Sequence, residues 1–347
     1  MTTTTFPGDG YVLCSSEQDV LRAMGVLCQV EYLILDCEGR NLGREDGVLS
    51  LVCVGTPYDD VYVFDAVTLR RGTATMDALL DLLSNKAVIK IMWDGRMDYL
   101  EILLTFGIHI DGVLDLQIAE VVSRFAVRGE TEDDHIRRLQ NSFFGFTLVR
   151  SIPHMFKDVH LVIGMQKCLD MLGLGDRFQK DPVVQAMHSA NQTHRWLERP
   201  LEPRLAAYAA QDIRLLGVLY DTFCKLGWIL PSHRPGLVAH SARYVSLFQT
   251  REASVAYSRR RAWTVLPLDI LDEPHGTLYP CGMCQRALSK HCFLLGSIGR
   301  LEYHHRYCRT CWVVCEKRRE DVRSPDKWVP IWESLIDTPA YITSASR

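Results

Sequence analysis

The sequence of 347 residues lacks any apolar run long enough to cross a lipid bilayer. Its longest apolar stretches, such as VLSLVCVG, fall far short of the roughly 20 residues that a membrane-spanning helix requires. The opening MTTTTFPGDG has neither the basic start nor the apolar segment of a secretory signal. Apart from its threonines, the chain has no low-complexity tract and no internal repeat. We therefore expect a soluble intracellular protein, nuclear or cytoplasmic, with no membrane contact and with residues 1–10 disordered.

Charge and cysteine are distributed unevenly along the chain. Residues 1–230 carry 22 Lys or Arg against 31 Asp or Glu, whereas residues 231–347 carry 17 against 11. Each part has six of the twelve cysteines, but those of the second part cluster in CxxC pairs, which in an intracellular chain favour metal binding over disulfides. We expect a main domain at 11–230, a basic linker or helix at 231–275, a zinc-binding module at 276–320 and a tail at 321–347.

Strands and helices alternate in the first part, which indicates an α/β domain. Residues 124–158 interrupt this pattern because they mix charged and aromatic residues without a clean period. We interpret them as an insertion, for which a mobile loop is one form; the sequence does not tell whether such a loop gates a substrate channel. Helical periodicity returns at 161–174 and again, strongly, at 202–226.

The stretch EYLILDCEG reads as a buried strand, yet it carries two acids. Side chains on a strand alternate between its faces, so Asp36 and Glu38 lie side by side on one face. Like charges at this spacing cost free energy unless a cation, a shared proton or abundant water compensates. The pair therefore predicts a bound partner, although a solvated strand end would also accommodate it.

Two further acids lie on helices. Tyr208 and Asp212 have the spacing i, i+4 beside an apolar stripe, which directs Asp212 toward the core. In IMWDGRMDYLEIL a strand breaks into a helix; Asp94 is expected to cap it, and Asp98 falls in its first turns. Asp98 alone could be structural, since acids early in a helix complement its dipole.

Together, Asp36, Glu38, Asp98 and Asp212 form the oxygen ligand set that two divalent cations such as Mg²⁺ or Mn²⁺ require for in-line displacement at phosphorus. In this interpretation Tyr208 orients or deprotonates the attacking water.

The order of LDCEG, IMWDGRMDYLEIL, DLQIAE and RWLERPLEPRLAAYAAQDIRLL resembles the DEDDy branch of the RNase D-like 3′-5′ exonucleases. It is most similar to eukaryotic exonuclease-domain proteins related to piRNA-biogenesis factors. The motif acids of the family match Asp36, Glu38, Asp98 and Asp212, and its tyrosine matches Tyr208. The resemblance covers residues 11 to about 228 and implies an RNase H-like fold with a mixed, mainly five-stranded sheet flanked by helices.

The second part contains the pairs CGMC and CRTC, separated by 23 residues. Two such pairs complete a tetrahedral, all-cysteine site for one structural Zn²⁺, formed by Cys281, Cys284, Cys308 and Cys311 in a zinc-ribbon-like module. Competing ligands are His291, Cys292, His304, His305 and Cys315. Basic residues flank the module, which would suit a grip on phosphates; a solvated face or a protein-docking surface would explain them nearly as well.

The sequence favours a metal-dependent 3′-5′ exonuclease acting on single-stranded nucleic acid, with RNA favoured over DNA. An alternative is a catalytically inactive adaptor that binds RNA or protein partners through the same fold and the zinc module. A third option, a zinc-dependent regulator of transcription type, requires that most of the function survive deletion of residues 1–230.

Overall fold

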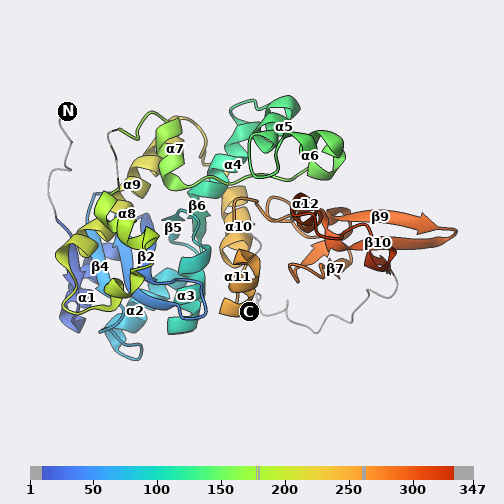
Figure 1. Cartoon of the computed structure of the whole chain (residues 1–347). Helices are drawn as coiled ribbons and strands as arrows, with labels where there is room; N and C mark the ends of the chain where they lie inside the picture. Colours follow the sequence, from blue (N-terminus) through green and yellow to red (C-terminus); the bar gives the residue numbers. More distant parts are fainter. Residues whose placement is uncertain (1–9, 177, 179, 260–262, 332–347) are drawn as a thin grey trace. The chain divides into compact units, whose positions relative to one another are not determined.

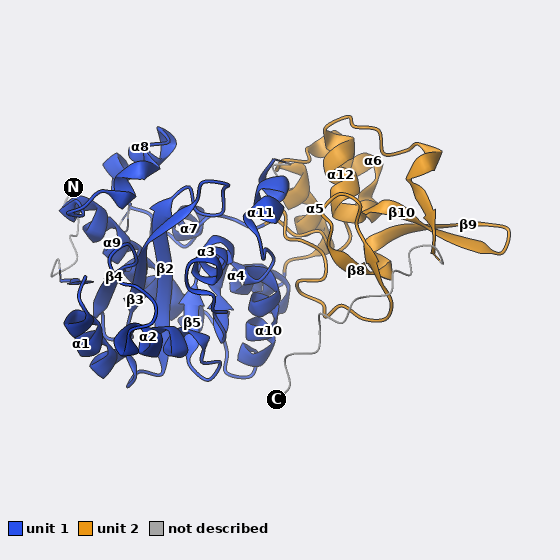
Figure 2. Cartoon of the chain, turned by 90° about the horizontal axis from the view of Figure 1, so that it is seen from below, with its two compact units in different colours: residues 1–129, 162–259 blue, residues 130–161, 260–347 orange. Residues whose placement is uncertain are grey.

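The computed structural model describes residues 10–176, 178, 180–259 and 263–331. The chain divides into two compact units, coloured in Figure 2: unit 1 comprises residues 1–129 and 162–259, and unit 2 comprises residues 130–161 and 260–347. The expected disorder of the N-terminus, the end of the expected tail and the arginines at 260 and 261 lie outside the described residues.

Unit 1 is built on a mixed six-stranded sheet with the strand order β1, β4, β3, β2, β5, β6 (Figure 1). β3 is antiparallel to both of its neighbours, whereas the β1–β4, β2–β5 and β5–β6 pairs are parallel. The strands are β1 (Val12–Cys14), β2 (Tyr32–Arg40), β3 (Val48–Gly55), β4 (Val61–Asp65), β5 (Ile89–Met92) and β6 (Val113–Asp115). The sheet thus has one strand more than the resemblance implied, because the three residues of β1 add an edge.

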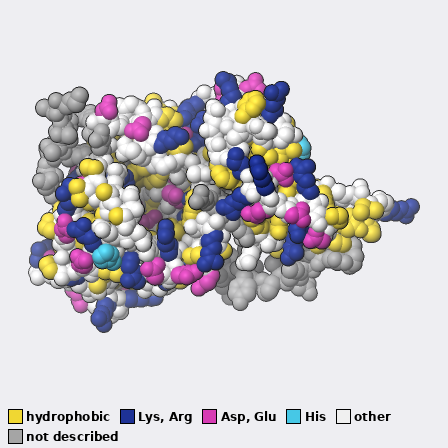
Figure 3. Space-filling view, in the orientation of Figure 1, with side chains coloured by type: hydrophobic (Ala, Val, Ile, Leu, Met, Phe, Trp, Pro, Cys, Tyr) yellow, Lys and Arg dark blue, Asp and Glu magenta, His cyan; other side chains and the backbone are white. Residues whose placement is uncertain are grey.

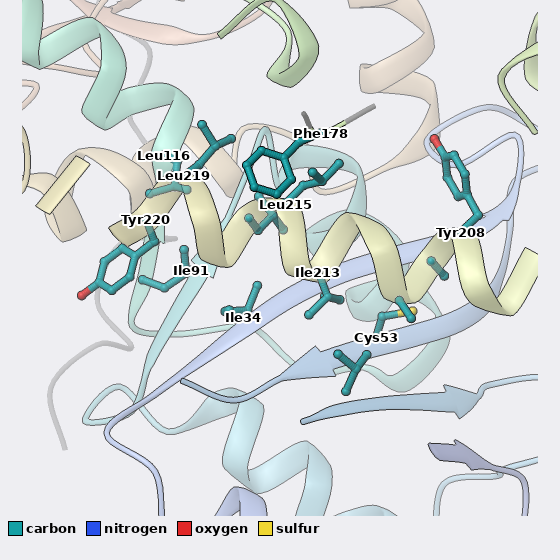
Figure 4. Packing of buried hydrophobic residues seen from close by; sticks show 14 of the residues in the cluster. Ile34, Cys53, Ile91, Leu116, Phe178, Tyr208, Ile213, Leu215, Leu219 and Tyr220 are labelled. Carbon is teal, nitrogen blue, oxygen red and sulfur yellow. The ribbon is translucent and has the colours of Figure 1, made fainter. Parts of the chain in front are cut away.

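Helices cover both faces of this sheet. The helices of unit 1 are α1 (Glu17–Leu27), α2 (Ala74–Ser84), α3 (Arg96–Phe106), α4 (Leu116–Ala126), α7 (Met165–Met171), α8 (Pro182–Ser189), the 3₁₀ helix η2 (Thr193–Leu197), α9 (Pro203–Lys225), α10 (Arg234–Val245) and α11 (Arg251–Ser258). Buried residues of α1, α2 and α3 share one apolar cluster with one face of the strands. On the other face α9 packs its stripe, including Ile213 and Leu219, against strand residues such as Ile34 and Ile91 (Figure 4).

Unit 2 joins the insertion to the C-terminal segment. Its elements are α5 (Glu132–Gln140), α6 (Phe146–Ser151), η1 (Pro153–Phe156), β7 (Leu278–Pro280), β8 (Ala287–Ser289), η3 (Lys290–Cys292), β9 (Phe293–Ile298), β10 (Leu301–Cys308), α12 (Arg309–Lys317), η4 (Pro325–Lys327) and β11 (Trp328–Pro330). Phe144 and Phe156 of the insertion share one buried cluster with Val313 of α12. Residues 130–156 are therefore largely helical and packed, in contrast to a mobile loop.

The structure also divides the chain differently from the predicted boundary near residue 230. Much of the expected linker forms α10 and α11, which belong to unit 1. Ser241 of α10 accepts the N–H of Asp115 at 2.9 Å, and Arg251 of α11 pairs with the buried Glu101 at 2.6 Å. Unit 2 includes residues 130–161, so a protein lacking residues 1–230 would lose part of unit 2. That deletion is therefore a poor test of the regulator hypothesis.

The new division changes the charge balance as well. Unit 2 contains 17 Lys or Arg and 15 Asp or Glu, so it is nearly neutral, because the insertion contributes acidic residues of α5. On the face shown in Figure 3, basic and acidic side chains are interspersed over both units. The expected basic module is thus largely balanced by acids of its own unit. Within the described ranges, every helix is too short or too polar to cross a bilayer.

Candidate active site

Strand β2 places Asp36 and Glu38 on the face of the sheet that α9 covers. Leu33, Leu35 and Cys37 alternate with them and belong to the apolar cluster on the opposite face. The pairing of β2 with β3 shifts register after Glu38, at Gly39. A Cβ at Gly39 would lie 2.2 Å from the carbonyl oxygen of Val48, so only glycine permits this close approach directly after the two acids.

Helix α9 brings Asp212 to the same place. Gly55 of β3 allows the approach, since a Cβ there would lie 2.3 Å from a methyl group of Ile213, the residue after Asp212. Carboxylate oxygens of Asp36, Glu38 and Asp212 all lie within 4.8 Å of one another, and Glu38 and Asp212 are buried. Three acids from positions far apart in the sequence therefore converge, as the sequence predicted.

Asp98 lies beside this group, in the first turn of α3. Its Oδ1 accepts the backbone N–H of Cys37 at 2.8 Å, between the two acids of β2. The prediction that Asp94 caps α3 is wrong: Gly95 is the N-cap, and Asp94 has a φ of 54° and pairs with the buried Arg96 at 2.5 Å. Both carboxylate oxygens of Asp94 accept hydrogen bonds from the Arg96 guanidinium, and α3 has no side-chain cap.

The electrostatics of the four acids follow from their burial and proximity. Burial and the charges of Asp98 and Asp212 raise the pKa of Asp36 well above its usual range, and burial with the charges of Asp36 and Asp212 does the same for Glu38. Burial raises the pKa of Asp98 to about 7 and also raises the pKa of Asp212. As protein alone, the cluster is therefore destabilised in its fully ionised form, and bound cations would relieve this.

One carboxylate oxygen of Asp212 is free to bind a cation. Its Oδ1 is buried and has no hydrogen-bond partner among the described residues. Most buried polar atoms of proteins are satisfied, and an orphaned carboxylate oxygen within a group of acids is the ligand atom that a hard divalent cation takes. The residues present thus fit divalent cations.

Lys180 also reaches the cluster, which sequence reasoning missed. Its Nζ lies 2.7 Å from Asp212 Oδ2 and 3.4 Å from the hydroxyl of Tyr208. Although burial lowers the pKa of Lys180, the charge of Asp212 outweighs it, so that the pKa is raised and the ammonium stays charged. Lys180 precedes α8, in a segment without regular periodicity, and nothing in the sequence pattern points to its role.

Tyr208 lies one turn before Asp212 on α9, as the spacing of the two residues predicted. The ring centroids of His188 and Trp196 lie 6.0 and 6.3 Å from that of Tyr208. Burial and the charge of Asp212 raise the pKa of its phenol. The hydroxyl is therefore protonated at neutral pH and can donate a hydrogen bond.

A second group of ligands lies in unit 2, where the sulfur atoms of Cys281, Cys284, Cys308 and Cys311 lie within 4.8 Å of one another. The first pair follows β7, and the second begins α12, with Cys308 as its N-cap. The antiparallel hairpin of β9 and β10 lies between the two pairs in the chain. The backbone N–H of Cys308 donates to the sulfur of Cys281 at 3.2 Å.

The competing ligands that the sequence left open have other contacts. His304 Nδ1 lies 2.9 Å from the carbonyl of His305, and His305 Nε2 lies 2.9 Å from the carbonyl of Val322. The thiol of Cys315 faces the sulfur of Met283 at 3.3 Å. His291 and Cys292 lie together beside Asp269.

Comparisons with known proteins agree with this architecture. Residues 11–228 match the 3′-5′ exonuclease family, and the chain therefore belongs to that family. The fold resembles that of Trypanosoma brucei RNase D, with 20% identity, a TM-score of 0.53, and coverage of 70% of this chain and 73% of that chain. The complex of T. brucei RNase D with RNA U12 is 19% identical, with a TM-score of 0.50 and coverage of 70% of this chain and 71% of that chain. Its GMP complex is 19% identical, with a TM-score of 0.52 and coverage of 80% of this chain and 82% of that chain. A comparison with curated proteins finds no match. At these identities, the likeness to RNase D concerns the fold.

Proposed function

We propose that the protein is a metal-dependent 3′-5′ exonuclease that removes nucleotides from the 3′ end of single-stranded RNA. The observation that carries the proposal is the convergence of Asp36, Glu38 and Asp212 within 4.8 Å, with Asp98 beside them, in a chain of the 3′-5′ exonuclease family. That T. brucei RNase D has been captured with RNA U12 and with GMP supports RNA as the substrate class.

In this proposal the four acids hold two Mg²⁺ or Mn²⁺ ions. Such ions supply activation of water and stabilisation of the charge that develops on the phosphate and on the leaving 3′ oxygen. The protonated phenol of Tyr208, 3.4 Å from Lys180 Nζ and one turn from Asp212, donates a hydrogen bond that orients the attacking water. Deprotonation of that water by the phenol is disfavoured, because a group with a raised pKa is already protonated.

The test uses end-labelled single-stranded RNA and DNA with Mg²⁺ or Mn²⁺. Stepwise shortening from the 3′ end is expected for the wild type and is abolished in Asp36→Asn and Asp212→Asn. Asp221→Asn is the matched control, because Asp221 is an exposed acid on the same helix α9 and should leave shortening unchanged. Absence of shortening in the wild type, or its persistence in both cluster variants, would reject the proposal.

One observation favours the second candidate, an RNA-binding adaptor without activity. The ammonium of Lys180 already offsets part of the charge of the acid cluster in the absence of metal ions. An adaptor would bind labelled RNA with an affinity that Asp36→Asn and Asp212→Asn leave unchanged, and its melting temperature would not respond to Mn²⁺. The exonuclease is expected to melt at a higher temperature with Mn²⁺, and this gain is expected to vanish in both variants.

For unit 2 we propose that Cys281, Cys284, Cys308 and Cys311 hold one structural Zn²⁺, since four thiolates without an open position are typical of zinc sites that fold a module. The expectation that unit 2 binds phosphate groups depended on an excess of basic residues, and the near balance of charge in unit 2 removes that excess. A solvated face and a protein-docking surface both remain compatible with this charge balance.

A further inference from the structure

Unit 2 holds a third group of ligand atoms, apart from the acid cluster and the four cysteines. It consists of Asp269, His291 and Cys292, one oxygen, one nitrogen and one sulfur that lie within 4.8 Å of one another. Asp269 Oδ1 is 3.0 Å from Cys292 Sγ and 3.4 Å from His291 Nε2, and the sulfur is 3.7 Å from that nitrogen. The three atoms thus form a compact triangle.

The backbone around the triangle fixes the carboxylate. Asp269 adopts a φ of 58°, and its Oδ2 accepts the N–H of Ser289 at 2.7 Å, which leaves Oδ1 directed at the other two residues. The carbonyl of Leu268 accepts a hydrogen bond from Arg286 at 2.6 Å, which holds the preceding peptide. Asp269 is therefore anchored in its unusual conformation by contacts on either side.

One side of the triangle is buried and the other reaches solvent. Asp269 and Cys292 are buried, whereas the side chain of His291 is 42% exposed. The ring of His275 stacks on that of His291 with a centroid distance of 5.3 Å and an angle of 16°, which orients the imidazole. An ion could enter from the side of His291 without opening the core.

We propose that Asp269, His291 and Cys292 form a second zinc site, with three protein ligands and a fourth position open to solvent. Zinc binds carboxylate oxygen, imidazole nitrogen and thiolate sulfur at about 2.0 to 2.3 Å, so two ligands of a tetrahedral ion are roughly 3.3 to 3.6 Å apart. The observed 3.0, 3.4 and 3.7 Å bracket these separations. A mixed oxygen, nitrogen and sulfur donor set also suits zinc better than it suits magnesium or calcium.

Binding requires one proton to leave. The thiol of Cys292 donates its hydrogen to Asp269 Oδ1 in the structure. When the ion binds, the thiol proton passes to solvent, and the sulfur and the carboxylate oxygen both turn from this hydrogen bond to the ion. The hydrogen bond between Asp269 and Ser289 is unaffected, because it uses the other oxygen. An open fourth position distinguishes this site from the closed site of four cysteines.

The experiment measures zinc per chain by elemental mass spectrometry on the full-length protein, purified and dialysed without chelator. The wild type is expected to hold two zinc ions, and His291→Ala and Cys292→Ser are each expected to hold one, a twofold loss. Cys28→Ser, which changes an exposed cysteine of unit 1, is the control and should keep two. Because the side chain of His291 is partly exposed, His291→Ala is expected to fold even if Cys292→Ser does not.

A second measurement assigns the ions by titration with Co²⁺, whose absorbance reports thiolate ligands. In the wild type the site of four cysteines and the site with one thiolate should fill as two separable steps, and His291→Ala should lack the step of weaker thiolate absorbance. A zinc content that is the same in the wild type and in both variants, with no Co²⁺ step lost in His291→Ala, would overturn the proposal whether or not the four cysteines hold an ion.

Discussion

The substitution Asp98→Asn tests the electrostatic reasoning about the acid cluster most directly. Burial raises the pKa of Asp98 from 3.8 to about 7. The folded protein therefore binds more protons at this residue than the unfolded chain does between about pH 4 and pH 7, and the free energy of unfolding falls as the pH rises through that window. Asparagine does not titrate, so the variant should escape this loss.

The magnitude follows from the same values. A pKa change from 3.8 to about 7 corresponds to roughly 4 kcal/mol above pH 7, at about 1.4 kcal/mol for each tenfold change in proton affinity. The hydrogen bond from Cys37 is already contained in this pKa. Part of the roughly 4 kcal/mol is offset, because the amide buries one more N–H donor than a protonated carboxyl does, at a cost of about 1 to 2 kcal/mol where it finds no acceptor. We expect Asp98→Asn to be more stable than the wild type by about 2 kcal/mol at pH 8 without divalent ions.

Mn²⁺ should reverse this order. An ion present at a hundredfold excess over its dissociation constant stabilises the folded protein by about 2.7 kcal/mol. The wild type should gain this increment, and Asp98→Asn should gain little, because it has lost one carboxylate of the ligand set. The variant would then be the less stable protein in Mn²⁺ and the more stable one without it.

The assay is urea unfolding at pH 5, 6, 7 and 8, in buffer freed of magnesium and manganese but without chelator, so that zinc stays bound. Asp115→Asn is the matched control. Burial also raises the pKa of Asp115 to about 7, but Asp115 caps α4 and accepts the N–H of Gly95 at 2.9 Å, outside the acid cluster. It should change the pH dependence and leave the response to Mn²⁺ intact. An Asp98→Asn protein that is no more stable at pH 8 and responds normally to Mn²⁺ would refute the reasoning.

Three further outcomes are expected. Lys180→Met removes an ammonium that competes with divalent ions for Asp212, so calorimetric titration should show Mn²⁺ binding at about tenfold lower concentration than in the wild type; unchanged affinity would place Lys180 outside the ion site. Tyr208→Phe should slow shortening of labelled RNA by about 100-fold with the response to Mn²⁺ retained, whereas an equal loss of both would mean that the tyrosine only supports the fold. Cys311→Ser should lower the zinc content by one ion per chain and the melting temperature of unit 2, measured by scanning calorimetry; an unchanged zinc content would remove Cys311 from the ligand set.

Local rules of chain geometry account for what could be predicted of the candidate site. The alternation of a strand placed Asp36 and Glu38 on one face, and the spacing of a helix placed Tyr208 and Asp212 on one side of α9. Both placements depend only on residues close in sequence, and the structure agrees with them. Asp98 taken alone has an ordinary structural explanation, because an acid in the first turn of a helix complements its dipole, and it joined the proposed ligand set only together with the other three acids.

Contacts between distant segments account for what was missed. Lys180 reaches the acids through tertiary packing and not through a periodic pattern. Asp94 pairs with Arg96 and does not cap α3, which a sequence signal for capping does not reveal. Asp269 likewise lies in a segment without periodicity, and only the fold of unit 2 brings it to His291 and Cys292.

The division of the chain into units was missed for the same reason. Residues 130–161 have no clean period because their apolar side chains, such as Phe144 and Phe156, are buried against a segment more than a hundred residues away. A helix pattern in sequence reflects burial on one face, and this signal is blurred when short helices are buried on several sides.

The charge balance of the acid cluster bears on whether the fold acts as an enzyme or as an adaptor. Four ionised carboxylates leave a net charge of −3 when only Lys180 opposes them, and such an excess is costly in a buried site. Two divalent ions would neutralise the four acids, and the ammonium of Lys180 would then remain as a single positive charge beside Tyr208. One phosphodiester group of a bound strand carries the single negative charge that completes the balance. The four acids, Lys180, two ions and one phosphodiester group would therefore be neutral as a set, and this is the state that the proposed exonuclease activity requires.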